Sequence, residues 1–198
     1  EILTEKFDGS AKIGYVFPDE PWKSIGFQNS FNSHNQDSYF GLREFNIHQK
    51  SYYSNLLYNS ILSNTMHKFS TGINFTYDGY DEFVGALDGS STTDFSRKDN
   101  SVGAFFEYDF SLVAGVRVDN HNRLGTFITP RIHSRYNPWD GGTIKASVGR
   151  GVRSASIFAE NQHLFASSRE FNILNTNGKI YGLDPEVAWN YGVSLMQD

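Results

Sequence analysis

The feature that most constrains this chain is an alternation of apolar and polar residues with a period of two. It is clearest in residues 69–78, 101–109, 112–119 and 187–195. One set of alternate positions in these segments is apolar with a single exception, Thr71, whereas the other set is mainly polar or glycine. A helix has a period of about 3.6 residues, but successive side chains of a strand point to opposite faces. The segments are therefore predicted to be strands with one apolar and one polar face.

Weaker versions of the same pattern predict further strands, around residues 13–17, 25–31, 52–62, 128–135 and 144–149. The expected fold is all-β, an antiparallel meander of about nine strands without a helix of any length. Each strand is close to the roughly 9–11 residues that a tilted strand needs to cross a bilayer. Pro130 falls inside a predicted strand and removes a ladder donor, so we expect a bulge or a locally broken ladder there.

The connections between these strands differ in length at the two ends of the sheet. Short turns are predicted at 18–21, 64–66, 110–111 and 137–141, and longer loops at about 34–48, 81–99 and 151–185, with 122–125 as one short exception. Aromatic residues collect at the short-turn end, namely Phe17, Trp22, Phe110, Tyr136 and Trp139. Outer-membrane barrels have short periplasmic turns, long outer loops and aromatic girdles at the membrane boundaries. The pattern therefore favours a slice of a large transmembrane β-barrel.

Alternation alone also fits a soluble β-sandwich, whose apolar face turns inward. Besides the turns and aromatic residues, glycines favour the barrel, because Gly26, Gly72, Gly103, Gly115, Gly149 and Gly192 all fall on polar faces. Glycines there weaken a solvated sheet, but on a barrel lumen they would let another chain segment approach closely.

In a barrel, one face of each strand meets lipid and the other lines the lumen. The apolar positions are predicted to face lipid: Phe69, Ile73, Phe75, Tyr77, Val102, Phe106, Val116, Val118, Trp189 and Tyr191. The alternate positions are predicted to face the lumen, among them Ser70, Asn74, Asp78, Glu107, Arg117, Asp119, Arg131, His133 and Arg135. Charged groups on that face need partners or water, and a wet lumen supplies both.

Composition excludes several classes of protein. The net charge is −5 without a basic block, which argues against a nucleic-acid partner. The chain has no Cys, so disulfides, cysteine-zinc sites and thiol catalysis are excluded. Mean hydropathy is −0.47, and the sequence has no apolar run near the roughly 18 residues that a membrane helix requires. Aromatic residues make up 16% of the chain, which argues against disorder.

Catalytic and metal motifs are weak. The six histidines include no HExxH pair, and His121, His133 and Asp119 suggest a metal site less well than a hydrated, paired lumen network. There is no Gly-x-Ser-x-Gly elbow, and Gly149–Arg153 lacks the Lys-Ser/Thr ending of a phosphate loop. We therefore predict no enzyme, no metal site and no cofactor.

Four segments carry a family resemblance. Gly115–Asp119 is similar to a "GxRxD" strand, Phe127–Ile132 to an "xxPRxx" strand, Ser147–Ala155 to a "GxGFRxP" segment, and Leu183–Gly192 to an "LxPExxxNxExG" strand. In this order and spacing they resemble the barrel of TonB-dependent outer-membrane receptors, most closely the Bacteroidetes-type siderophore or cobalamin receptors. The departures are small, such as Val152 where an aromatic residue is common.

The resemblance implies that residues 1–198 are part of a receptor barrel. The family's plug domain, its TonB-contact segment and its usual terminal aromatic residue are absent from the sequence, and such barrels have about 22 strands. The implied function is binding and energised import of a small-molecule ligand, such as a ferric siderophore (a metal chelate), haem or cobalamin. The implied surroundings are outer-membrane lipid, the plug domain and TonB. The alternatives are a passive outer-membrane porin-like barrel and a soluble secreted β-sandwich binding module.

Ligand contacts are expected near the long loops. The connection 151–185 is rich in apolar residues and is expected to fold over the barrel mouth: Ile157, Phe158, Leu164, Phe165, Phe171, Ile173, Leu174, Ile180 and Tyr181. Arg150 and Arg153 precede it and suit an anionic ligand through forked hydrogen bonds. In the alternative, Arg153 pairs with Glu160 or Glu170 and only shapes the loop. Asp81 and Glu82 are further candidate ligand residues, or simply part of a solvated loop.

Overall fold

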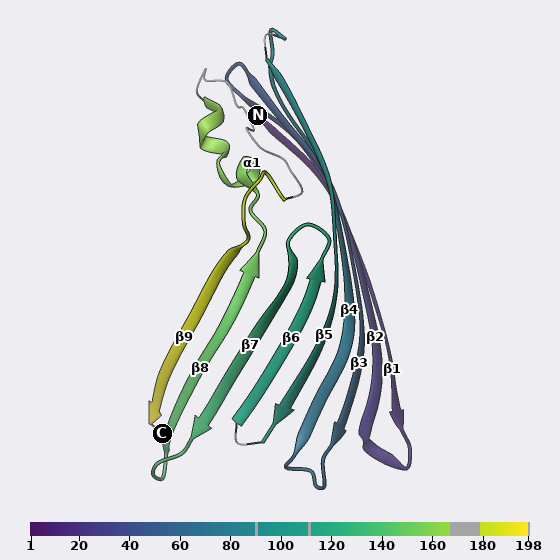
Figure 1. The fold of residues 1–198 in the computed structure, drawn as a ribbon, viewed down its shortest axis with the longest axis vertical. Coiled ribbons are helices and arrows are strands. Elements are labelled where there is room, and N and C mark those ends of the chain that lie inside the picture. The colour runs from purple at the N-terminus through teal and green to yellow at the C-terminus, as the bar shows by residue number, and fades with distance from the viewer. Residues whose placement is uncertain (90, 111, 167–178, 198) are drawn as a thin grey trace.

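The structure, a computed structural model, describes residues 1–89, 91–110, 112–166 and 179–197. In these ranges nine strands form one antiparallel sheet, in which every strand pairs with its neighbours in sequence (Figure 1). The strands are β1 (Ile2–Phe17), β2 (Glu20–Phe40), β3 (Arg43–Ile61), β4 (Lys68–Ala86), β5 (Thr92–Asp109), β6 (Leu112–His121), β7 (Gly125–Tyr136), β8 (Gly142–Arg153) and β9 (Glu186–Gln197). The predicted all-β meander of about nine strands is confirmed.

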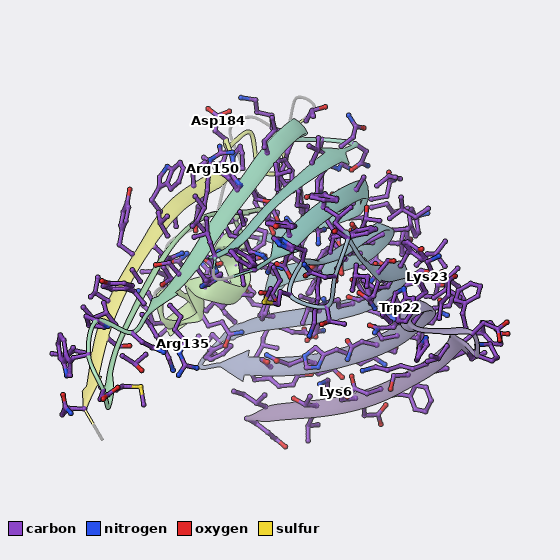
Figure 2. The ribbon with its side chains drawn as sticks, turned by 90° about the horizontal axis from the view of Figure 1, so that it is seen from below. Lys6, Trp22, Lys23, Arg135, Arg150 and Asp184 are labelled. Atoms are coloured by element: carbon purple, nitrogen blue, oxygen red, sulfur yellow. The ribbon has the colours of Figure 1, made fainter. Side chains whose placement is uncertain are left out.

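The sheet is not flat. Seen from below it bends into an open arc, and the helical segment between β8 and β9 lies on its concave side (Figure 2). This segment holds the four-residue α1 (Ile157–Glu160) and the 3-10 turn η1 (Gln162–Ala166). Among the described residues, no helix has the length and apolar character needed to cross a membrane.

Two of the predicted long loops are wrong. Residues 34–48 and 81–99 continue the ladders of β2 with β3 and of β4 with β5, so these hairpins turn only near Gly41 and Gly89. Both glycines have positive φ, 65° and 73°, as tight turns often require. β2 is therefore 21 residues long and β4 is 19, and the long strands rise above the ends of β6–β9 (Figure 1).

The outer face explains why the sequence pattern misses these upper strands. On β3, for example, outward positions from Tyr58 to Tyr52 are apolar except Ser54, and those from Lys50 onward are polar. On β5 the same change comes after Val102. Immediately above it both faces are polar, as at Lys50 and Gln49, and higher up the apolar residues lie on the concave face instead, as Phe45 and Ile47 do. The alternation is therefore interrupted although the ladder continues. The apolar band covers about ten residues from the short turns, which at the usual strand tilt gives about the 25 Å of a barrel's apolar belt.

Pro130 interrupts one ladder and leaves the other intact. β6 and β7 pair continuously through Val116 and Pro130, without a bulge. The β7–β8 pairing, however, begins only at Arg131 and Gly149, although both strands extend further. Beyond this point the Arg150 guanidinium donates a hydrogen bond to the Ile128 carbonyl. The expected locally broken ladder is therefore present on the β8 side, and the alternative expectation of a bulge is wrong.

Candidate functional site: the inner wall and its strap

The polar residues of the sheet lie on its concave face. The register aligns Glu107 with Gly115 and Arg131, Gly103 with Asp119, and Val113 with His133. Arg97 has the same parity along β5 as Gly103, and it contacts the segment on the concave side. The concave face, which we call the inner wall, therefore carries the predicted lumen set Glu107, Arg117, Asp119, Arg131, His133 and Arg135. The alternate residues, including Val116 and Ile73, are exposed on the convex face.

Ion pairs satisfy much of the charge on the inner wall. Arg117 Nη2 lies 2.7 Å from Asp119 Oδ1, and the Asp119 side chain is only 4% exposed. Arg131 pairs with Glu107. Gly103 makes room for this network, because a Cβ atom there would stand 2.1 Å from Asp119 Oδ1. In the described structure, this glycine therefore admits a neighbouring side chain rather than a separate chain segment.

Several depressions line the inner wall and contain predicted lumen residues together with further polar side chains. One, of about 590 Å³, lies toward the short turns and contains His133, Arg135 and Lys145. Another, of about 500 Å³, lies higher on the wall and contains Arg117 and Asp119 with a further group of polar residues, namely Asp78, Asp99, Ser101, His121, Arg150, Arg153 and Ser154.

The described parts of the β8–β9 connection, residues 154–166 and 179–185, form a strap across the upper inner wall. Four of its side chains are buried against three wall residues, Phe45, Ile47 and Val84: these are Phe158, Phe165, Ile180 and Tyr181. The burial predicted for these strap residues is confirmed, whereas Leu164 remains 46% exposed. Phe171, Ile173 and Leu174 lie outside the described residues.

Arg97 anchors the strap to the wall. Its side chain is 1% exposed, and its guanidinium carbon lies 4.2 Å from the ring centre of Tyr80 and 5.0 Å from that of Tyr181. The guanidinium donates to the carbonyl oxygen of Ala155 at 3.3 Å and to Ser156 Oγ at 3.2 Å. A residue of the wall thus holds both ends of the strap through stacking and hydrogen bonds.

Burial shapes the ionisation of this anchor. It raises the pKa of the Glu82 carboxyl, and the hydrogen bond from Tyr181 and the charge of Arg97 only partly oppose the shift. Burial also raises the pKa of Tyr80 to about 12. Desolvation disfavours the charged form of an acid, which explains both directions.

The four predicted ligand residues are dispersed. Arg153 pairs with Glu160 at 3.0 Å and Glu186 at 2.6 Å, which supports its alternative role in shaping the loop; Glu170 lies outside the described residues. Arg150 bridges to β7 as described above. Asp81 and Glu82 are strand residues on opposite faces, and only Glu82 is on the inner wall, where it is buried. The interpretation of both as part of a solvated loop is therefore wrong.

The two histidines considered as metal ligands, His121 and His133, have different surroundings. His121 Nδ1 accepts backbone hydrogen bonds from Arg123 at 3.1 Å and Leu124 at 3.3 Å, so it caps the β6–β7 turn. His133 lines the lower depression. In the described part of the chain no three His, Asp or Glu side chains are grouped so as to hold a metal ion.

Sequence reasoning missed Arg97, Tyr80 and Asp99. Arg97 and its strap partners are separated by 58 and 59 residues, and no local pattern links positions so far apart. The one feature of the sequence that could have pointed to Arg97 is its position between two segments rich in polar and aromatic residues.

Comparisons with known structures agree with this geometry. The chain is similar to the copper transporter OprC (14% identity, TM-score 0.64), covering 96% of this chain and 36% of that one. It is similar to the alcaligin outer-membrane receptor FauA of Bordetella pertussis (14%, TM-score 0.63; 98% and 34%). It is also similar to the ferric-catecholate import receptor Fiu of E. coli K12 (10%, TM-score 0.61; 98% and 38%). The chain thus spans about a third of the length of these structures.

A comparison with curated protein sequences finds no match. A family model described as "TonB dependent receptor-like, beta-barrel" matches residues 5–196, almost the whole chain. Proteins of this family are receptors and transporters of the bacterial outer membrane, not enzymes. With its nine-stranded wall, polar concave face and matching family model, this chain belongs to the TonB-dependent receptor β-barrel family.

Proposed function

We propose that the full protein is an outer-membrane receptor that binds a scarce nutrient, such as a ferric siderophore, haem or cobalamin, and imports it with energy delivered through TonB. The plug domain and the TonB-contact segment belong, in this proposal, to the parts of the protein outside residues 1–198. The similar structures include an alcaligin receptor, a ferric-catecholate import receptor and a copper transporter, which supports a metal chelate as ligand.

The observation that carries this proposal is the strap. A passive pore needs an open, water-filled lumen, whereas here apolar side chains and Arg97 hold a segment against the inner wall. The strap lies at the end of the sheet opposite the short turns (Figure 1). Short turns are periplasmic in bacterial barrels, so the strap is extracellular in this proposal. There it contributes to ligand capture or gating.

The predicted ligand residues acquire different roles in this proposal. Arg150, beside the upper depression, and Glu82, beneath the strap, remain predicted ligand contacts. Arg153 shapes the strap through its two ion pairs. Asp81 lies on the outer face and has no ligand role.

The test is deletion of residues 156–180 in the full receptor. Binding and uptake of radiolabelled ferric siderophores, haemin and cyanocobalamin are measured at matched outer-membrane abundance, with a TonB-deficient host as control. We expect TonB-dependent uptake of one ligand class by the unaltered receptor, and weaker binding or uptake after the deletion. Uptake that does not depend on TonB would contradict the receptor in favour of a passive pore. Unchanged affinity and uptake would show that the strap takes no part.

A further inference from the structure

The upper inner wall holds a phenol group in a specific setting, and that phenol comes from the strap. The Tyr181 ring stacks on Phe95, with centroids 4.5 Å apart and an interplanar angle of 26°. Arg97 lies beside the same ring, 5.0 Å from its centre. The Tyr181 hydroxyl donates a hydrogen bond to Glu82 Oε2. Ring face, cation and acceptor all belong to β4 and β5, so the wall is shaped to receive a phenol.

The backbone at Tyr181 indicates that side-chain contacts hold this residue in place. Its φ is 52°, in the left-handed region that favours glycine. A bulky residue adopts that conformation only when its surroundings impose it. Here the contacts of the phenol with the wall supply that constraint.

Tyr181 does not provide hydrogen-bond partners for all the polar atoms around it. Glu82 is 3% exposed, yet its Oε1 atom has no hydrogen-bond partner among the described residues. Arg97 Nε makes no hydrogen bond there and only an ion pair with Asp99 Oδ2 at 3.5 Å. The two bonds from Arg97 to the strap, at 3.3 and 3.2 Å, are at the long end of the usual range. A buried carboxylate oxygen without a donor is costly. Tyr181 therefore leaves the site incompletely satisfied, which limits how firmly it holds the strap in place.

The Glu82 carboxylate also restricts which ligand groups can bind at this site. A carboxylate attracts protonated hydroxyl groups and repels anionic oxygens. A catecholate that coordinates iron presents deprotonated, metal-bound oxygens and has no proton to donate. The group that binds is therefore an aromatic ring with a neutral hydroxyl group that does not coordinate a metal.

We propose that Phe95, Arg97 and Glu82 form a binding site for a phenol group of the imported ligand, and that Tyr181 of the strap occupies this site in its absence. Ligand and strap then compete for one position. A ligand that displaces Tyr181 removes its stacking and hydrogen bond, and so loosens the strap. Occupancy of the wall is thereby coupled to opening of the strap. This inference rests on the proposed function, because the molecule that competes with Tyr181 is the imported ligand.

The test uses the full receptor in detergent, with p-cresol, the tyrosine side chain itself, as probe and toluene as the matched probe without a hydroxyl. Tyr181→Gly vacates the site and suits the left-handed backbone, so the strap can keep its course. We expect the variant to bind p-cresol about tenfold or more tightly than toluene, as a hydrogen bond to a charged group implies. Adding Glu82→Gln should reduce that preference. Tyr77→Ala, which removes a phenol from the outer face, is the matched control and should create no such site.

A second measurement follows the unaltered receptor. Saturating p-cresol should increase hydrogen exchange of the strap amides at residues 179–185, and toluene should do so less. Equal affinity of the two probes for Tyr181→Gly, or strap exchange that p-cresol leaves unchanged, would overturn the proposal. Because p-cresol binding requires no import, a receptor that passes these tests but imports no nutrient would contradict the proposed function alone. A receptor that imports a nutrient but fails them would contradict this site alone.

Discussion

Placing an arginine on the lipid-facing side of β6 tests the assignment of the two faces. Val116 is 43% exposed on the convex face, four residues above the start of β6 at Leu112, and so near the middle of the apolar band. An arginine near the bilayer midplane of a barrel costs about 2–4 kcal/mol. Since each 1.4 kcal/mol is a factor of ten, Val116→Arg should shift the unfolding equilibrium of the receptor by about 30- to 1,000-fold.

The control for this variant places the same side chain on the other face. Gln28 of β2 lies on the inner wall, in register with Lys12 and Asn55. Gln28→Arg should change the free energy of unfolding by less than about 1 kcal/mol, because a wet lumen solvates the new charge. The assay is urea unfolding of the full receptor in lipid vesicles, followed by Trp fluorescence. Equal stability of Val116→Arg and the unaltered receptor, with loss of stability in Gln28→Arg, would refute the assignment.

Three further predictions follow from the same structure. Residues 1–198 expressed alone should need detergent and bind no siderophore, because both edge strands are unpaired; a soluble monomer that binds ligand would contradict this. Since burial raises the pKa of Glu82, strap closure favours protonation of Glu82 in the range between the ordinary value of 4.5 and the raised pKa, and closure should weaken as pH rises through this range. Hydrogen exchange of residues 179–185 against pH measures this, and Glu82→Gln should flatten the profile. Gly103→Ala should lower stability by about 1–3 kcal/mol through overpacking, whereas Gly149→Ala, whose new Cβ would meet its nearest neighbour at 3.7 Å, should be nearly neutral in the same unfolding assay.

The sequence predicted those parts of the fold in which one face meets lipid. Val116 and Arg117 alternate because one face of β6 is apolar and the other is polar, and this contrast identifies the strand and its orientation. The upper halves of β2–β5 escaped prediction because the pattern breaks where Ser33 and Lys50 are as polar as their inward neighbours, and above this break the apolar residues lie on the inner face. Hydrogen bonding between main chains, which continues there, leaves no trace in side-chain composition.

The candidate site was harder to predict than the sheet. Burial of strap residues such as Phe158 followed from their apolar character, because a long, hydrophobic connection needs a surface to cover it. The wall residues that contact the strap could not be predicted in this way, because they come from strands distant in sequence. Tyr181 and Glu82 meet across 99 residues, and only the register of β3–β5 brings the wall beneath the strap.

The central claim is that this chain is a barrel wall with lipid on one face and a wet lumen on the other. Because the chain has no Cys, single cysteines along Leu112–His121 of the full receptor in lipid vesicles, with any other cysteines replaced, can each carry a spin label. The most direct measurement is the accessibility of each label to oxygen, which partitions into lipid, and to a water-soluble nickel complex. The account predicts a period of two, with oxygen favoured at positions 112, 114, 116 and 118 and the nickel complex at 113, 115, 117 and 119. The same accessibility at all positions, or oxygen favoured at 117 and 119, would contradict it.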